Sequence, residues 1–229
     1  MKHLASVNFL PDPAKSRAKR PIPKASQGHF VGEFVFGFDK PQRVGFASLL
    51  EYNAALCAVY RPGFVDLEEQ LERVVFRKLN GKPGDHYLDY RVTYHNGLRI
   101  GMAVKPAAIA AKPEFQATMR AVARAAVSRV VDKVVVVTER HIHPVELHNA
   151  ELFHAARRPV ADEDRVIGEL CARLRTPNTV EAMLDQGRHD GVTLFGVARA
   201  IHGRGLRLVR NERIDHSALV AANDVRQAA

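Results

Sequence analysis

Tryptophan is absent from this chain of 229 residues, and aromatic residues make up only 7% of it. Proteins that bind single-stranded nucleic acid without sequence preference stack bases on aromatic rings, so a platform of that kind is not predicted. The only cysteines, Cys57 and Cys171, lie in apolar helical patterns. They are expected to be small core residues in a reducing cytoplasm.

Long apolar runs are also missing: none approaches the ~20 residues that a membrane-spanning helix needs. The first residues lack the apolar stretch of a signal peptide. No glycine-rich phosphate-binding motif of the nucleotide hydrolases occurs, so ATP hydrolysis by this chain is not predicted. These absences predict a cytoplasmic protein with no membrane partner.

Positive charge is what the chain has in excess. Lys and Arg number 34 against 25 Asp and Glu, a net charge of +9. A surplus of this size favours a polyanionic partner such as DNA, although solubility alone is the alternative explanation. Residues 1–40 are predicted to form a basic, proline-punctuated arm. Its cations are expected to lie along phosphates, unless the arm is only a solvated tail: Lys15, Arg17, Lys19 and Arg20.

Hydrophobic periodicity predicts a mixed α/β domain over residues 41–158. Asn96-Gly97 predicts a tight hairpin turn. The expected strands are 28–38, 64–70 continuing through 74–76, 87–94, 98–105 and 133–138, the last buried on both faces, with a loop at 80–85. The expected helices are 42–60, 113–131 and 147–158.

Residues 162–229 form a second predicted unit. Three short amphipathic helices are followed by a turn and a short strand near residues 203–210. This order predicts a small helical, winged-helix-like domain, and an arbitrary helical cap is the alternative.

Three side chains suggest chemistry. Glu51 lies in an apolar helical pattern, Asp89 in a strand-like run, and Lys105 at the end of the next expected strand. Two acids that hold a divalent cation, with a lysine that orients water and offsets phosphate charge, fit a metal-dependent phosphodiesterase. Each residue also has an ordinary explanation. Glu51 fits a helix-surface charge, Asp89 an outward residue between buried Leu88 and Tyr90, and Lys105 a strand-end cation.

Five motifs occur in a particular order: Phe46–Tyr52, Phe64–Gln70, His86–Tyr90, Met102–Pro106, and Val137–Glu139 followed by Asn149–Leu152. Together they resemble the TnsA-type transposon endonucleases over roughly residues 40–158. The resemblance implies a restriction-endonuclease-like mixed sheet flanked by helices, and a nuclease that needs Mg²⁺ or Mn²⁺ to cut double-stranded DNA at transposon ends. It implies Glu51, Asp89 and Lys105 as catalytic residues, with Glu51 and Asp89 as metal ligands. It also implies two partners, a separate transposase or integrase subunit and an ATP-dependent regulator.

One position departs from the family pattern. The family has Glu or Gln two residues before the lysine, and this chain has Ala103 there. Glu68, Glu69 or a backbone carbonyl with water are possible substitutes for the missing oxygen ligand. The alternative is a weak or inactive nuclease that acts as a DNA-binding or assembly factor.

Two further groups of residues suggest binding sites. Arg120, Arg124 and Arg129 on one expected helix predict phosphate contacts or a solvated basic face. A cluster of histidines suggests a metal site, although its spacing fits no familiar zinc signature and surface or DNA-facing histidines are favoured: His141, His143, His148 and His154.

Overall fold

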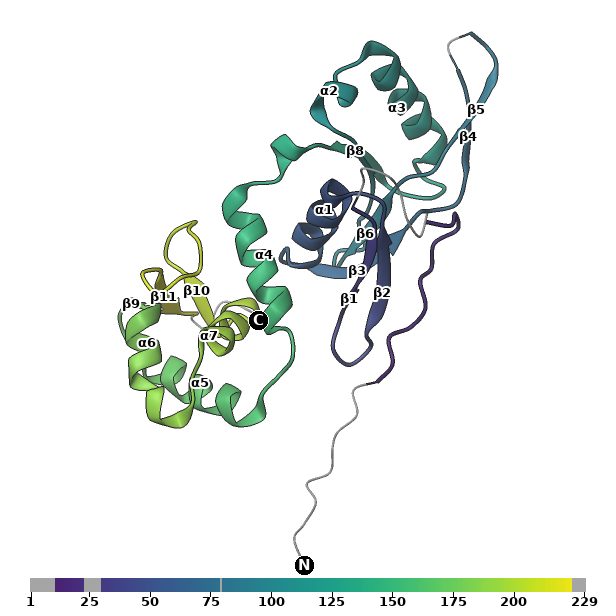
Figure 1. The fold of residues 1–229 in the computed structure, drawn as a ribbon. Helices are drawn as coiled ribbons and strands as arrows, with labels where there is room; N and C mark the ends of the chain where they lie inside the picture. The colour runs from purple at the N-terminus through teal and green to yellow at the C-terminus, as the bar shows by residue number, and fades with distance from the viewer. Residues whose placement is uncertain (1–10, 23–29, 79, 224–229) are drawn as a thin grey trace, which may run out of the picture.

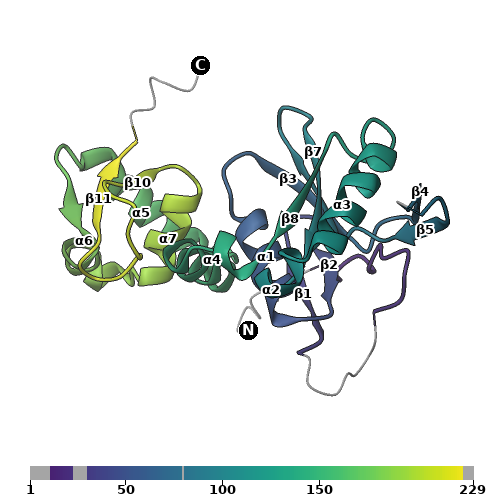
Figure 2. The same ribbon diagram turned by 90° about the horizontal axis from the view of Figure 1, so that it is seen from above.

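The computed structural model of the chain describes residues 11–22, 30–78 and 80–223. Figures 1 and 2 show two packed regions connected through the long helix α4 (Pro144–Ala156). The first region contains a mixed four-stranded sheet with helices, and the second contains helices and three short strands. The predicted mixed α/β class is therefore confirmed. Parts of the predicted arm and first strand, residues 1–10 and 23–29, lie outside the described residues, as do residues 224–229 at the end of the chain.

The first hairpin pairs β1 (Gly32–Phe36) with β2 (Gln42–Phe46) in antiparallel register. The helix predicted from residue 42 is therefore wrong over its first turns. Val44 and Phe46 are buried at two-residue spacing, which is the period of a strand. Helix α1 (Leu49–Val59) begins only after Ser48, whose side chain caps it.

The central sheet has the order β3-β6-β7-β8. Its strands are β3 (Phe64–Glu69), β6 (Tyr90–Tyr94), β7 (Arg99–Val104) and β8 (Lys133–Val137). The first three are antiparallel neighbours, and β8 runs parallel to β7. The predicted turn joins β6 to β7, with Gly97 at a φ of 79° that favours glycine. As an edge strand, β8 is only partly buried, so the prediction that it is buried on both faces is wrong.

A second hairpin corrects two more predictions. The strand at 74–76 does not continue β3 but belongs to β4 (Val74–Arg77) in a separate sheet. The predicted loop at 80–85 contains β5 (Pro83–His86), which pairs with β4. Strand β5 consists of Pro, Gly, Asp and His, so it has no apolar alternation by which a strand could be predicted. It needs none, because only one face of the hairpin packs on the protein.

Different helices cover the two faces of the central sheet (Figure 1). On one face, α1 packs with the first hairpin against Leu67, Tyr90 and Val104. On the other, α3 (Pro113–Ala126) packs against Leu88 and Ala103. The short α2 (Ala107–Ala110) precedes it. The predicted helix at 113–131 therefore ends five residues early, because Val127 is extended and Ser128 has a left-handed φ of 69°.

Helix α4 links the two regions. It packs on α1 through Leu56, Cys57 and Ala150. On its other side the Asn149 amide donates to Glu212 O at 2.9 Å and accepts from Ile214 N at 2.9 Å. The 3-10 turn η1 (Glu139–His141) leads into α4. The predicted boundary near residue 158 falls just after this helix.

The C-terminal region has its own apolar core around Ile167, Met183 and Leu206. Its helices are α5 (Ala161–Arg173), α6 (Val180–Gln186) and α7 (Leu194–His202), with the 3-10 turn η2 (Arg188–Asp190). Its sheet has the order β10-β11-β9. These strands are β9 (Asn178–Thr179), β10 (Leu206–Leu208) and β11 (Leu219–Ala222). The three predicted helices and the strand near 206 are present.

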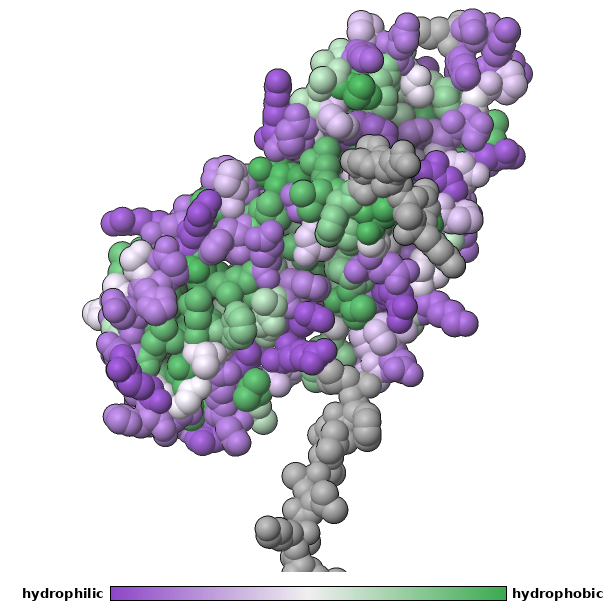
Figure 3. All heavy atoms as spheres, viewed as in Figure 1, coloured by the Kyte–Doolittle hydropathy of each residue, from purple (hydrophilic) through white to green (hydrophobic). Residues whose placement is uncertain are grey.

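Within the described residues, no helix is long and apolar enough to cross a membrane. Figure 3 shows hydrophobic residues over the region of α1 and over the C-terminal helices, interrupted and bordered by polar ones. Scattered apolar surface of this kind is ordinary for a folded domain.

Candidate active site

Glu51 lies in the first turn of α1, and its side chain folds back on the start of the helix. The carboxylate accepts hydrogen bonds from Ala47 N at 2.9 Å and from Ser48 Oγ at 3.3 Å, while Ser48 Oγ accepts from Glu51 N. The Ser48 side chain thus caps α1, and the Glu51 carboxylate is tied to the two residues that precede the helix. The residue is only 6% exposed, so the helix-surface explanation of Glu51 does not hold.

The electrostatics of Glu51 connect it with the two other predicted site residues. Burial raises the pKa of Glu51 above its ordinary value, and the hydrogen bond from Ala47 opposes this. The nearby negative charge of Asp89 raises the pKa further, and the positive charge of Lys105 lowers it. The three groups thus share one electrostatic environment.

This raised pKa gives a stability prediction. When a carboxyl has a higher pKa in the folded than in the unfolded protein, the free energy of unfolding falls as the pH rises between the two values. The reason is that ionisation of the carboxyl costs more in the folded state. Glu51→Gln is therefore expected to raise the free energy of unfolding by ~1 kcal/mol near neutral pH. The gain should vanish below about pH 4, where the side chain is protonated in both states.

Urea unfolding near pH 4 and near pH 8 measures this difference. The control is Glu114→Gln, which changes an exposed glutamate in the first turn of α3. A destabilised Glu51→Gln protein at the higher pH would contradict the assignment of a buried, costly charge to Glu51.

Asp89 lies immediately before β6, at an irregularity that rotates the chain. Leu88 and Tyr90 are both fully buried but pack on opposite faces of the sheet, which a regular strand does not allow for residues two apart. The outward orientation considered for Asp89 is therefore wrong, since Asp89 is itself only 5% exposed. Its Oδ2 accepts a hydrogen bond of 2.7 Å from Val104 N, which fixes the carboxylate beside the end of β7.

Lys105 directly follows β7, and its backbone N–H bonds to Val137 O of β8 at 3.0 Å. Its Nζ lies 4.0 Å from Asp89 Oδ2. The side chain is 36% exposed, so the ammonium group reaches solvent while it faces a buried carboxylate. The structure thus gathers Glu51, Asp89 and Lys105 at one end of the central sheet.

Ala103 is fully buried among apolar residues on the α3 face of the sheet. The position where the family has Glu or Gln is therefore an apolar packing position in this chain. Of the substitutes considered, Glu68 is bound to Arg91 at 2.6 Å. Glu69 is 1% exposed, and its Oε1 accepts from Ser16 Oγ and Arg17 N of the arm.

Two residues that sequence reasoning did not single out border Asp89. Gln70 is buried, with its Nε2 3.5 Å from Asp89 Oδ1. Burial lowers the pKa of His86, while the charge of Asp89 raises it and that of Lys105 lowers it. Both residues belong to quoted motifs, but nothing in a glutamine or a histidine of a short motif distinguishes its role.

Buried polar atoms without hydrogen-bond partners gather in this part of the molecule. Among the described residues there are four: Arg17 Nε, Glu69 Oε2, Gln70 Oε1 and His86 Nε2. Gln70 and His86 neighbour Asp89. Arg17 and Glu69 are bonded to each other beside it, through Arg17 N and Glu69 Oε1. Such atoms are rare in folded proteins and often indicate a functional site or a missing ion or water.

The described part of the basic arm, residues 11–22, runs alongside this corner. Lys19 N donates to Gln70 O at 2.8 Å, and the Arg20 guanidinium lies 5.4 Å from the centre of the Tyr87 ring. Lys15, Lys19 and Arg20 are exposed. Arg17 differs from the prediction, because both of its terminal nitrogens bind Asp66, at 2.9 and 2.7 Å. Its role is to anchor the arm to β3.

Other predicted residues lie apart from this corner. Arg120, Arg124 and Arg129 are exposed, the first two on the side of α3 away from the sheet and the third just beyond the helix. The histidines serve local structure. His141 and His143 accept hydrogen bonds at the starts of η1 and α4, and His154 bonds to Tyr60. No group of three or more His, Cys, Asp or Glu among the described residues is arranged to hold a metal ion.

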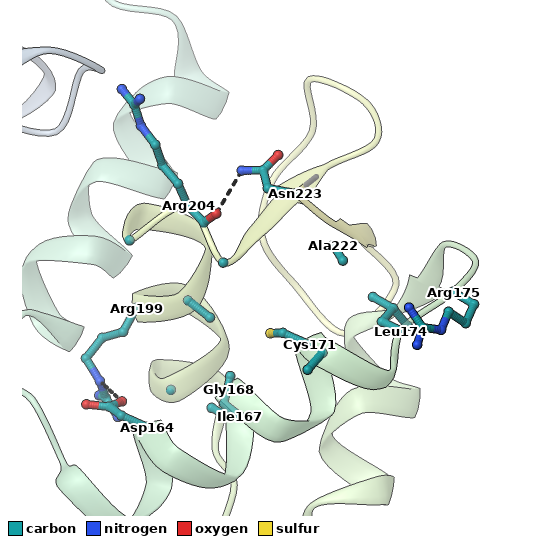
Figure 4. Close-up of a pocket in the computed structure, with 15 residues that line it drawn as sticks. Asp164, Ile167, Gly168, Cys171, Leu174, Arg175, Arg199, Arg204, Ala222 and Asn223 are labelled. Atoms are coloured by element: carbon teal, nitrogen blue, oxygen red, sulfur yellow. Dashed lines mark hydrogen bonds and ion pairs between the residues drawn. The ribbon is translucent and has the colours of Figure 1, made fainter. Parts of the chain in front are cut away.

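The C-terminal region contains a hollow of about 700 Å³ (Figure 4). Arg199 and Asp164 form an ion pair on one side of it, and Asn223 donates to Arg204 O on another. Cys171 lines it as well. Glu51, Asp89 and Lys105 are not among its residues, so the hollow and the candidate active site are separate features.

Comparison with protein-family models and with curated proteins gives no match for this chain.

Proposed function

We propose that this protein is a metal-dependent DNA endonuclease of the restriction-endonuclease-like fold, similar to the TnsA-type subunit that cuts at transposon ends. The observation that carries the proposal is the convergence of two buried carboxylates and a half-exposed lysine at one end of the sheet, with Asp89 and Lys105 4.0 Å apart. The pairing of β6 with β7 brings Asp89 close to Lys105, and Glu51 joins them from the separate helix α1.

The donor chemistry of this corner fits Mg²⁺ or Mn²⁺. Both prefer oxygen ligands, and Mg²⁺ commonly uses one or two carboxylates together with water and substrate phosphate. Glu51 and Asp89 would hold the cation. When bound, it would supply charge that stabilises the pentavalent phosphorus and lowers the pKa of attacking water.

The chain's own residues have distinct tasks in this proposal. Val104 N holds Asp89 Oδ2 in a fixed orientation, so the carboxylate need not reorganise during reaction. The Lys105 ammonium group faces both Asp89 and solvent. From there it can orient a phosphate oxygen of the substrate and the attacking water. The raised pKa of Glu51 makes this carboxylate a ready proton acceptor, and cation binding would favour its ionised form.

The arrangement of elements supports the finer description of the fold. A mixed sheet with α1 on one face and α3 on the other presents the candidate residues at the ends of β6 and β7. In the C-terminal region the order α5-β9-α6-α7-β10-β11 is that expected of a winged-helix-like domain. By the family resemblance, we propose that it works with a separate transposase or integrase subunit and an ATP-dependent regulator.

The direct test uses supercoiled plasmid with Mg²⁺ or Mn²⁺. The wild-type protein should convert the plasmid to open-circular or linear DNA, and Lys105→Ala should not. Omission of the cation, or addition of a chelator, should stop the reaction. Equal activity of the wild-type and Lys105→Ala proteins would remove Lys105 from the mechanism.

Measurement of DNA affinity tests whether the cations of the arm contact phosphates. Lys19 and Arg20 lie beside Gln70 and Tyr87, so a scissile duplex at the site would pass them. The Lys19→Ala/Arg20→Ala double variant should bind DNA more weakly and reduce the slope of log K against log salt by about 2, one for each lost phosphate contact.

The matched control is Lys40→Ala/Lys133→Ala, which removes the same charge. Lys40 follows β1 in the hairpin turn, and Lys133 begins β8 at the end opposite Lys105. Equal losses in the two double variants would show that the net charge, and not the arm, governs binding.

A second function has one observation in its favour. Ala103 is buried in an apolar cluster and provides no ligand, which fits a catalytically weak DNA-binding or assembly factor with a nuclease fold. Salt-sensitive DNA binding without nicking, and without measurable binding of Mn²⁺, would support this alternative.

A further inference from the structure

Gln70 is held in an unusual conformation next to Asp89. It has a left-handed φ of 43°, a strained conformation for a residue with a side chain. The backbone around it is pinned on both sides: Gln70 N donates to Asp89 O at 2.7 Å, and Gln70 O accepts from Lys19 N at 2.8 Å. This left-handed residue directly after β3 places its side chain against the Asp89 carboxylate.

The Gln70 amide is only half satisfied. Its Nε2 lies 3.5 Å from Asp89 Oδ1, a long hydrogen bond, and its Oε1 is buried without a partner among the described residues. The residue is 2% exposed. An unpaired buried amide oxygen destabilises the folded state, and the backbone strain at the same residue adds to this cost.

We propose that Gln70 supplies the side-chain oxygen that Ala103 cannot, as the third oxygen donor beside Glu51 and Asp89. This inference rests on the proposed nuclease function. A half-turn about the last side-chain bond exchanges the amide oxygen and nitrogen, which are similar in size. The oxygen then lies where Nε2 is now, about 3.5 Å from Asp89 Oδ1.

The spacing suits a shared cation. Adjacent ligands of an octahedral Mg²⁺ are about 3 Å apart, because each Mg–O bond is about 2.0–2.1 Å and the angles are near 90°. Only a small adjustment of the Gln70 side chain is needed. A neutral amide also adds a ligand without further repulsion on Glu51, whose ionisation burial already opposes.

Neither of the other candidates for this role has a hydrogen bond to Asp89, although Glu69 Oε2 is also buried without a partner among the described residues. Glu68 pairs with Arg91 at 2.6 Å. Glu69 binds Ser16 and the backbone of Arg17 through Oε1, and it has no hydrogen bond to Asp89. Gln70 alone among these three residues has a side-chain contact with the central carboxylate.

Binding of Mn²⁺ to the full chain tests the proposal without reference to cleavage. Calorimetry or the electron paramagnetic resonance of free Mn²⁺ gives the Kd. Gln70→Met removes the oxygen at nearly constant size and should raise the Kd by at least about 10-fold. Gln70→Glu keeps an oxygen donor and should bind Mn²⁺ as tightly as the wild type or more tightly. Gln186→Met, at an exposed position of α6, is the matched control.

The two Gln70 variants separate a ligand from a positioning residue. If Gln70 only donated its N–H to Asp89, a glutamate at neutral pH would fail in that role just as methionine does. Equal weakening in both variants therefore overturns the proposal, and so does a wild-type Kd in Gln70→Met. If Gln70→Met does not fold, Gln70→Glu decides: retained affinity supports the proposal and lost affinity overturns it.

Failure of the underlying function gives a different result. If wild-type protein shows no Mn²⁺ binding that Asp89→Asn removes, the metal-dependent nuclease itself is wrong, whatever the Gln70 variants do.

Discussion

Asp89→Asn is expected to abolish Mg²⁺-dependent nicking while the protein remains folded. Asparagine keeps the shape of the side chain and an oxygen that accepts the 2.7 Å hydrogen bond from Val104 N. It removes the negative charge that holds a cation and faces Lys105. Loss of one preorganised charge-stabilising group usually costs ~10²–10³-fold in rate, and loss of a metal ligand should cost at least as much.

The nicking rate of supercoiled plasmid measures this effect, with thermal unfolding as the check on folding. Asp39→Asn is the matched control, since it makes the same change at an exposed position after β1. Asp89→Ala should be equally inactive, but it is the less clean variant because it leaves the buried Val104 N–H without its acceptor. Wild-type nicking by Asp89→Asn would remove Asp89 from the mechanism.

Arg199→Ala is expected to be the most destabilising single change in the C-terminal region. The guanidinium bonds to Glu163 at 2.5 Å and to Asp164 at 2.6 Å, and its side chain is only 14% exposed. Glu163 is still more buried, with 8% of its side chain exposed. Removal of one partner leaves a buried charge uncompensated, which typically costs ~3–5 kcal/mol.

The pH dependence of this loss has a definite sign. Burial alone would raise the pKa of Glu163, but hydrogen bonds from Thr193 and Arg199 bring it below its ordinary value. When a carboxyl has a lower pKa in the folded than in the unfolded protein, its ionised form stabilises the fold at pH values above the unfolded pKa. This contribution is lost as the pH falls through the folded pKa. The difference between wild type and Arg199→Ala should therefore shrink in acid.

Urea unfolding of the full chain gives the free-energy difference, with far-UV circular dichroism as the signal. Arg165→Ala is the control. It breaks an exposed i,i+4 pair with Glu169 in the same helix as Glu163 and should cost no more than about 0.5 kcal/mol. If the two variants lose the same stability, the Arg199 cluster is not the anchor that its burial indicates.

The boundaries of several elements could be read from the sequence because local chemistry sets them. Asn96-Gly97 requires a turn and Thr179 caps α6, whereas the start of α1 at its Ser48 cap was not predicted. Strand β2 of the first hairpin and strand β5 of the second were missed. The apolar residues of β2 run into the helical spacing of α1, and β5 is polar with a glycine, so neither strand has a clear pattern of its own although each pairs with a strand close by in the sequence.

The candidate site shows the same division. Sequence motifs selected Glu51, Asp89 and Lys105, and the structure brings these residues to one end of the sheet. The motifs did not predict that Arg17 pairs with Asp66, or that Gln70 lies against Asp89 with an unpaired oxygen. Both facts depend on how the arm meets β3 and the residue that follows it, which no residue pattern encodes by itself.

The sequence by itself determined the composition of the protein: its positive charge, its alternation of helices and strands, and the types of side chain available for chemistry. Only the tertiary structure decided which of those side chains meet. Charge and periodicity are properties of neighbours along the chain, whereas a shared site depends on strand pairing, one irregular turn at Gln70, and the burial that these impose on Asp89.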